Sequence, residues 1–180
     1  MSAHGTYERI EGRFALRYVR HLPHPIDKVW AAVTQPAELA SWFPCRVEVV
    51  LRVGGPMRFV FPDHHTEVSE ASEGEVLALD PPRRFWFSWD AEEMRIDLEP
   101  TPDGGCALTF SDLMPDDYNE GAARTAAGWH VCLDMLAVLL DRGQAVAPTD
   151  EPTDHWRELY DAYVALGFPH GAPMPGGQAS

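Results

Sequence analysis

Lysine and cysteine are scarce in this sequence, and long hydrophobic runs are missing. Lys28 is the only lysine, and 14 Lys and Arg stand against 28 Asp and Glu, which gives a formal net charge of −14. Nucleic acids and anionic membranes are bound mainly through Lys and Arg. We therefore expect neither a nucleic acid nor a membrane as a partner.

The three cysteines, Cys45, Cys106 and Cys132, are widely spaced and include no C-x-x-C pair. This spacing argues against a disulfide framework and against a zinc ribbon. Residues 1–12 lack the apolar run of a signal peptide. The longest apolar stretch, residues 135–140, is far too short to cross a bilayer. We expect a soluble protein in the reducing environment of the cytoplasm.

The chain is long and apolar enough for one well-packed domain. It has 180 residues, of which 45% are hydrophobic and 11% aromatic, and this aromatic content is too high for an intrinsically disordered chain. We assign residues 11–145 to a single domain. Residues 146–180 are expected to form a linker, a C-terminal helix that packs on the domain, and a frayed tail.

The first half of the domain has the pattern of a strand, two short helices and a series of strands. Alternating apolar residues over 14–18 indicate a half-buried strand. Apolar residues at helical spacing then predict short helices over residues 26–33 and 36–43. Residues 46–110 have a period of two with Gly- and Pro-rich turns, which predicts five or six strands in an antiparallel meander. Within them, residues 62–72 are polar and loop-like.

One long helix follows, over residues 119–142, and it is apolar on most of its circumference. Such a helix is covered from more than one direction. A shorter helix over residues 156–165 places Trp156, Tyr160 and Tyr163 on one face, which suits packing on the domain or a contact in a homodimer. This order predicts an α+β fold in which a curved antiparallel sheet wraps around the long helix.

Several segments carry a resemblance to a known family, in that family's order. They are residues 21–34, 39–43, 53–59, 74–85 and 87–89, and Gly128-Trp129 followed by Leu133, Leu136 and Leu140. Together they resemble the START-like (SRPBCC, helix-grip) superfamily and, within it, the branch named after the activator of the heat-shock protein 90 ATPase. The resemblance implies a helix-grip fold, with two short helices after the first strand and a long C-terminal helix.

Members of this superfamily bind hydrophobic ligands between the sheet and the long helix, so the resemblance implies such a cavity here. A small hydrophobic or aromatic molecule is therefore the leading candidate for a partner. The alternative is that the same residues form ordinary core, and a one-residue shift in strand register would exchange Trp89 for Trp86. The residues expected to line the cavity are Trp42, Phe43, Met57, Phe59, Trp89, Trp129, His130 and Leu133.

His130 is the polar candidate in this set. Asp134 follows one helical turn later and is suited to orient its imidazole, so the pair would position a ligand carbonyl or act as general acid and base. The alternative is an i, i+4 pair on the helix surface. We assign no catalytic residue, and a cyclase- or hydrolase-like enzyme that uses His130 is the alternative to a binding protein.

The branch name also gives a second hypothesis, a chaperone cofactor or another protein-interaction role. The co-chaperone of that name joins such a domain to a separate N-terminal chaperone-binding domain, whereas a strand here already begins at Phe14. We therefore expect ligand binding rather than a chaperone partner, although the acidic surface suits a basic partner protein.

No metal site and no cofactor are expected. His64 and His65 stand beside acidic residues of the types that bind zinc or nickel, but adjacent side chains in an extended chain point apart. Acidic residues concentrate in residues 63–75, in residues 112–120 and in the last helix. The second of these segments lacks the spacing of an EF-hand loop, and we place it in a loop at the start of the long helix. The inward faces are expected to carry almost no acid.

Overall fold

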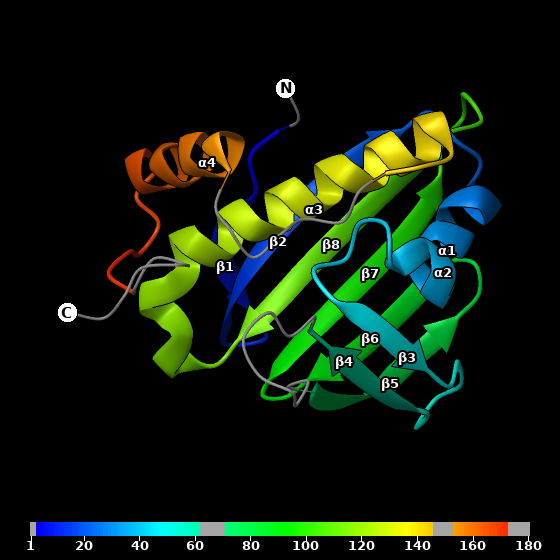
Figure 1. Ribbon diagram of the computed structural model, residues 1–180, viewed down its shortest axis with the longest axis horizontal. Coiled ribbons are helices and arrows are strands. Elements are labelled where there is room, and N and C mark those ends of the chain that lie inside the picture. Colours follow the sequence, from blue (N-terminus) through cyan, green and yellow to red (C-terminus); the bar gives the residue numbers. More distant parts are fainter. Residues whose placement is uncertain (1–2, 62–70, 146–152, 173–180) are drawn as a thin grey trace.

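The computed structural model describes residues 3–61, 71–145 and 153–172. They form one antiparallel sheet, one long helix and several shorter helices (Figure 1). The strands are β1 (Thr6–Ile10), β2 (Arg13–Leu22), β3 (Arg46–Val49), β4 (Pro56–Val60), β5 (Ala71–Asp80), β6 (Arg84–Trp89), β7 (Glu92–Pro100) and β8 (Cys106–Met114). The helices are α1 (Ile26–Thr34), α2 (Pro36–Leu39), the 3₁₀ helix η1 (Asp116–Gly121), α3 (Ala122–Arg142) and α4 (Asp154–Ala165).

The eight strands lie in the order β1-β2-β8-β7-β6-β5-β4-β3, and every neighbouring pair is antiparallel. Because β2 is hydrogen-bonded to β8, strands far apart in the sequence lie side by side. The sheet curves around α3, which crosses its concave face, and α1 and α2 lie at one end (Figure 1). The predicted α+β helix-grip architecture is confirmed, including the two short helices and the antiparallel meander from β3 to β8.

Strand β1 is an element that the sequence pattern did not reveal. The segment Thr6–Ile10 is mostly polar and pairs with β2 through a tight turn at Glu11 and Gly12, whose φ angles are 52° and 85°. Positive φ angles at both central residues are typical of two-residue hairpins, and glycine adopts them without steric cost. The sheet therefore begins before residue 11, which is the first residue of the predicted domain.

The core lies between the concave face of the sheet and α3. Phe87 of β6, Met94 of β7 and Phe110 of β8 alternate with outward residues, and each is at most 1% exposed. Burying a side chain of this kind stabilises the fold by about 1.5–3 kcal/mol. By length and composition α3 is apolar enough to cross a membrane, with a mean hydropathy of 1.2, but 56% of that stretch is buried inside the domain. It is a core helix here.

The start of α3 is held by the C-terminal segment of the chain. The helix begins three residues later than predicted because η1 precedes it. The backbone N–H of Ala123, in the first turn of α3, donates to the carbonyl of Pro169, and the N–H of Ala172 donates to the end of η1. Residues 169–172 thus lie against the start of α3, whereas residues 173–180 of the predicted frayed tail lie outside the described chain.

Helix α4 packs beside the N-terminal half of α3 (Figure 1). Thr153 caps its start by accepting a hydrogen bond from the N–H of Trp156 at 3.1 Å. Trp156, Leu159 and Tyr163 are buried against the domain. The apolar face of α4, which the sequence suggests for a homodimer contact, is thus largely covered by the rest of the chain.

Candidate functional site

The concave face carries a continuous cluster of aromatic rings beneath α3. Phe43, which follows α2, contacts Trp89 of β6 and Trp129 of α3 at ring-centroid distances of 5.5 and 5.4 Å. Phe59 of β4 stacks on Trp89 at 4.4 Å, and Trp42 joins the cluster through Phe43 at 5.5 Å. These five residues, called the ring cluster below, are all members of the predicted cavity lining.

The indole N–H of every tryptophan in the ring cluster has a partner, as is usual for buried tryptophans. These hydrogen bonds fix the orientation of the rings. Trp42 and Trp129 are buried, whereas Trp89 remains partly exposed. The acceptors are the carbonyl of Ala32 for Trp42 (2.9 Å), Ser72 Oγ for Trp89 (2.7 Å) and Asp112 Oδ2 for Trp129 (2.9 Å).

Met57 and Leu133, two further residues of the predicted lining, are 3% and 1% exposed. Met57 lies two residues before Phe59 on the same face of β4, and Leu133 follows Trp129 by one turn of α3. Both belong to the hydrophobic core that surrounds the ring cluster. A contact of any of these residues with a ligand stays a prediction.

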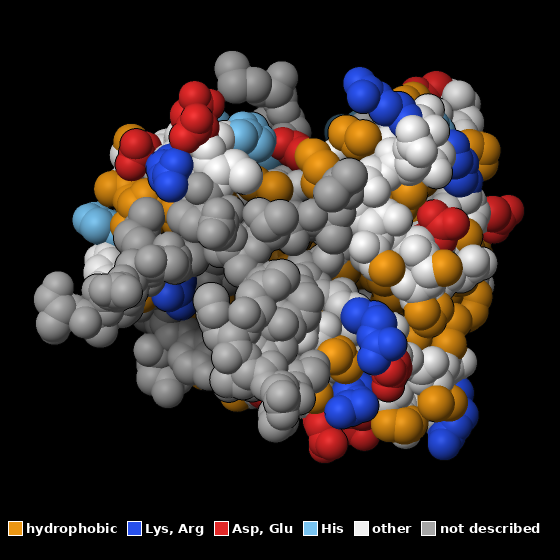
Figure 2. All heavy atoms as spheres, viewed as in Figure 1, with side chains coloured by type: hydrophobic (Ala, Val, Ile, Leu, Met, Phe, Trp, Pro, Cys, Tyr) orange, Lys and Arg blue, Asp and Glu red, His pale blue; other side chains and the backbone are white. Residues whose placement is uncertain are grey.

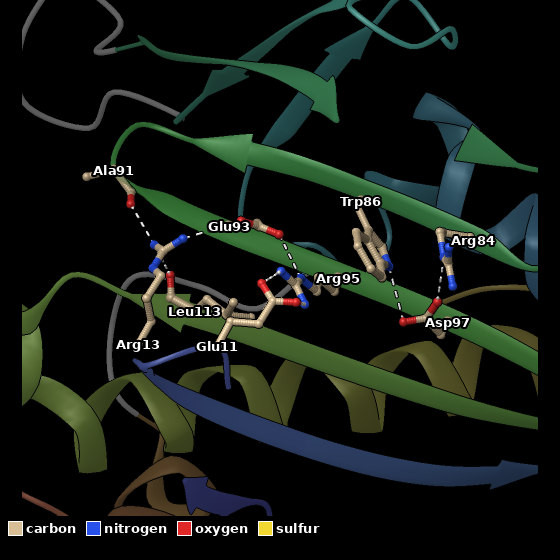
Figure 3. A network of polar contacts seen from close by, with 9 residues as sticks. All are labelled: Glu11, Arg13, Arg84, Trp86, Ala91, Glu93, Arg95, Asp97 and Leu113. Atoms are coloured by element: carbon tan, nitrogen blue, oxygen red, sulfur yellow. Dashed lines mark hydrogen bonds and ion pairs between the residues drawn. The ribbon is translucent and has the colours of Figure 1, made fainter. Parts of the chain in front are cut away.

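Trp86 lies on the outer face of the sheet, opposite to Trp89. Its ring is flanked by Arg84 and Arg95, whose guanidinium carbons lie 4.5 and 4.3 Å from the ring centroid (Figure 3). Its Nε1 donates to Asp97 at 3.1 Å. Cation–π contacts at exposed sites are worth about 0.5–1 kcal/mol each. The strand parity is therefore settled, with Trp89 as the inward tryptophan.

A charged network continues along the outer face of β7 to the turn between β1 and β2 (Figure 3). Arg95 donates to Glu93 at 2.6 Å and to Glu11 at 2.7 Å. Arg13 donates to Glu93 at 3.3 Å and to the carbonyl of Leu113 at 2.7 Å. The side chains of Arg95 and Glu93 are largely shielded from solvent, whereas that of Glu11 is exposed. The hydrogen bonds to Glu93 and Leu113 hold the guanidinium of Arg13 on this outer face.

Two carboxyl groups lie on the inner face of the sheet, next to Trp129. Asp112 of β8 is 0% exposed, and its Oδ1 has no hydrogen-bond partner within the described part of the chain. Glu92 of β7 points to the same face as Met94, and the register pairs Met94 with Asp112, so the two carboxyls are diagonal neighbours. The predictions that Asp112 lies in a loop and that the inward faces carry almost no acid are therefore wrong.

The sequence does contain a signal for both carboxyls. Leu108, Phe110 and Asp112 occupy successive inward positions of β8, and Glu92 precedes the inward residue Met94 by two positions. A strand that continues its alternation through an acidic residue turns that residue inward. The acidic composition of the segment after Phe110 suggested a loop and outweighed this alternation.

Burial changes the protonation of both carboxyls. Desolvation, with the charge of Asp90 as a second cause, raises the pKa of Glu92 to about 7. Desolvation and then the charge of Glu92 raise the pKa of Asp112 well above its usual value, against the opposing effects of the Trp129 hydrogen bond and of Arg13. Burial and the mutual repulsion of the two carboxylates therefore both favour a protonated pair, and the two groups titrate together.

His130 lies on a different side of α3, facing α4 and the N-terminal segment. Its Nδ1 is 2.7 Å from the hydroxyl of Tyr163, which accepts a hydrogen bond from the N–H of Gly5 at 2.9 Å. Desolvation lowers the pKa of His130 to about 4, although the charge of Asp134 opposes this. The lowered pKa favours the neutral imidazole, whose Nε2 lies 3.9 Å from Asp134.

The surroundings of His130 are closed by further side chains. His155 of α4 lies 3.3 Å from Asp134, and the ring of His4 meets His130 edge-on at 5.5 Å. Arg20 of β2 is 8% exposed, and its Nε and Nη2 have no hydrogen-bond partner among the described residues. His130 itself is 2% exposed. Its predicted ligand-binding role stays a prediction, and a ligand would have to displace Tyr163 to reach Nδ1.

An open groove lies at the other end of the sheet, along β3, β4 and β5. Its volume is about 430 Å³, and Met57, Arg58 and Glu73 are among its lining residues. Basic and acidic side chains stand together over these strands, at the lower right of Figure 2, and Glu48 pairs with Arg46 at 2.9 Å. This mixed charge gives the groove no preference for a ligand of one sign.

The metal alternative at His64 and His65 falls outside the described residues. Within residues 3–61, 71–145 and 153–172, no three His, Cys, Asp or Glu side chains gather in a way that would hold a metal ion. Cys45, Cys106 and Cys132 are free and buried.

Solved structures with low sequence identity share this fold. A conserved protein of unknown function from Enterococcus faecalis, EF2215, superposes with a TM-score of 0.71 at 20% identity, over 90% of this chain and 89% of that one. CalU16 from Micromonospora echinospora gives 0.66 at 23% identity, over 91% and 94%. DynU16, described as a putative protein in the dynemicin biosynthetic locus, gives 0.62 at 26% identity, over 72% of this chain and 48% of that one.

No curated protein sequence matches the chain. The model of one protein family does match, over residues 23–141, which is more than half of the sequence. The matched region begins just before α1 and ends at the last turn of α3, so it includes the ring cluster, Glu92 and Asp112. The chain therefore belongs to the family described as Activator of Hsp90 ATPase homolog 1-like protein, within the START-like superfamily.

Proposed function

We propose that this protein binds a small aromatic or otherwise hydrophobic molecule on the concave face of its sheet, beneath α3. The observation that carries the proposal is the ring cluster, in which Trp89 stays partly exposed beside the buried Trp129. Small-molecule sites are lined mainly by apolar and aromatic side chains with a few polar groups. The ring cluster with Asp112 and Glu92 beside it has this composition.

The ligand would lie against the partly exposed rim of the ring cluster. Phe61 is half-buried and lies 5.8 Å from Trp89, so the two rings extend the aromatic surface beyond β4. Trp42 and Leu133 form a second layer behind this rim. The origin of DynU16 in a biosynthetic locus supports a small molecule as the partner of this fold.

The test is calorimetric titration with 1-naphthalenemethanol, a neutral aromatic probe. Trp89→Leu is expected to weaken binding by at least about tenfold, because its ring forms the exposed part of the cluster. Trp86→Leu is the matched control, since it removes the same side chain from the outer face and should leave affinity within about threefold. Equal losses in both variants, or no binding heat in the wild type, would contradict the proposal.

The family match favours a second candidate function, a cofactor of the Hsp90 chaperone. Its description names an activator of the Hsp90 ATPase, and the net charge of −14 suits a basic surface on a partner. The test is the ATPase rate of purified Hsp90 with and without this protein. An unchanged rate over a wide concentration range removes this candidate.

The cytoplasm is the proposed location, in a reducing environment. All three cysteines are free and buried, which suits a compartment where thiols stay reduced. The same charge argument makes nucleic acid and anionic membrane unfavourable partners in this proposal. Sedimentation of the purified protein tests for a homodimer, which the proposal does not require.

A further inference from the structure

Asp112 is an unusual residue for the interior of this domain. It is 0% exposed, it lies on the inner face of β8, and only its Oδ2 has a hydrogen bond, the one from Trp129 Nε1 at 2.9 Å. A buried polar atom without a partner destabilises a fold, because it has lost its hydrogen bonds to water without replacement. Such a group is therefore a candidate for a ligand contact.

A second carboxyl faces the same place and also lacks a cationic partner. Glu92 is half-buried and is the diagonal neighbour of Asp112 on the inner face. Arg13 is the cation that acts on both groups, but its hydrogen bonds go to Glu93, Ala91 and Leu113 on the outer face. No hydrogen bond from a Lys or Arg reaches either carboxyl within the described chain.

Aromatic rings complete the surroundings of the pair. The register places Trp89 directly opposite Glu92, and Trp129 binds Asp112 through its indole N–H. The two indole rings meet edge-on at 6.3 Å. Carboxylates and the faces of aromatic rings both attract cations, and neither attracts an anion.

We propose that Asp112 and Glu92 form the recognition site for a protonated amine, so that the protein selects an aromatic or hydrophobic molecule that carries an amino group. This inference rests on the proposed function, since the ring cluster would hold the apolar body of the ligand. The ammonium group donates to Asp112 Oδ1 and to Glu92, and it also neutralises the charge that these two groups share. An ammonium offers three donors, which suits two carboxyls with unused lone pairs.

The test compares three probes that share one apolar body: 1-naphthylmethylamine, 1-naphthalenemethanol and 1-naphthaleneacetate. Each is titrated into the full chain by calorimetry at about pH 7.5 and low salt, where surface screening is weak. The amine is expected to bind at least about tenfold more tightly than the alcohol, and the acetate more weakly than both.

Glu92→Gln and Glu93→Gln are a matched pair of variants, because adjacent residues of β7 point to opposite faces. Glu92→Gln should reduce the preference for the amine over the alcohol to less than about threefold. Glu93→Gln should keep the full preference. Asp112→Asn tests the second carboxyl. If Asp112→Asn does not fold, the comparison of Glu92→Gln with Glu93→Gln decides the question by itself.

The outcomes separate this inference from the proposed function. If alcohol and amine bind equally, or if the preference persists in Glu92→Gln and Asp112→Asn together, the amine site is wrong while hydrophobic binding stands. Tighter binding of the acetate overturns the amine site as well. If no probe binds, the proposed function fails for aromatic molecules of this size, and the amine site fails with it.

Discussion

Trp129 and His130 are neighbours on α3, but their side chains enter two different polar environments. The partner of Trp129 is Asp112, which keeps one buried oxygen without a hydrogen bond beside a second carboxyl. His130 has Tyr163 on one ring nitrogen and Asp134 near the other. Burial of a polar group is common to both sides. His130 itself has its partners in place, whereas Asp112 Oδ1 does not, and a buried polar atom without a partner is a candidate for a ligand contact.

The two environments also differ in the elements that they connect. The Trp129 side joins α3 to strands β6, β7 and β8, all within the region that the family model matches. The His130 side joins α3 to α4 and to the N-terminal segment, both outside that region. The buried Arg20 stands at its border, where the charge of Asp134 acts on it. We interpret the His130 side as a structural contact that holds α4 and the N-terminal segment on α3.

The largest effect on stability is expected when the contact between α4 and α3 is removed at Tyr163. Tyr163→Ala should lower the free energy of unfolding by about 4 kcal/mol, because a fully buried ring is lost and His130 loses its partner. Urea denaturation at neutral pH measures this. Tyr160→Ala, a half-buried residue of the same helix, is the control, at about 1 kcal/mol. A loss no larger than in the control would contradict a structural role for the His130 side.

The next effect concerns the carboxyl side and its response to pH. Between its ordinary pKa of 4.5 and its raised pKa of about 7, Glu92 holds a proton in the native state that the unfolded chain has released. The contribution of Glu92 to stability should therefore fall by up to about 3 kcal/mol as pH rises through this range. Glu92→Gln should remove this contribution and leave that of Asp112, whose pKa is also raised, whereas Glu93→Gln should keep both. Urea denaturation near the two ends of the range measures the difference, and parallel curves for wild type and Glu92→Gln would argue against it.

The opposite slope is expected from His130. Its pKa falls from 6.5 to about 4 on folding, so in this range the unfolded chain binds a proton that the native protein does not. The contribution of His130 to stability should rise with pH here, by about 2 kcal/mol after allowance for screening. His130→Gln should remove this contribution, so that its stability falls more steeply with pH than that of the wild type, and His155→Gln, at the exposed partner of Asp134, serves as the control. The thermal midpoint measured across the range is the readout, and a slope unchanged in His130→Gln would disprove the assignment.

The smallest effect is expected at Tyr18, which lies between the two sides. Its ring contacts both Phe110 and His130, and its hydroxyl donates to the carbonyl of Ala126 at 2.9 Å. Tyr18→Phe should cost about 1 kcal/mol, since one hydrogen bond is lost and the ring stays. Neither pH slope should change. A changed slope would mean that the two sides are coupled through Tyr18.

Much of the fold could be predicted from the sequence because its signals are local. The alternation in β6 to β8 and the apolar stripe of α3 each lie within one element, and the ring cluster follows once these elements have an order. The predicted start of the long helix, at residue 119, is too early because residues 119–121 belong to η1 and not to α3. Strand β1 has no such signal, since its segment is polar and its pairing depends on a tight turn.

The partners of His130 could not be predicted in this way. Gly5 contributes a backbone N–H, which no residue type reveals, and Tyr163 is one of several aromatic residues on α4. The two are 158 positions apart in the sequence. Asp112 was missed for a different reason, since its position in the alternation was visible but its charge argued against burial.

The hydrogen bonds from Gly5 to Tyr163 and from Ala123 to Pro169 have a consequence for the order of events during synthesis. A nascent chain that ends near residue 145 already contains all eight described strands and α3. Until residues 154–169 follow, His130 and the first turn of α3 lack their partners. At ordinary elongation rates this interval lasts on the order of seconds. His130 and the first turn of α3 are therefore the parts of the domain that gain their partners last.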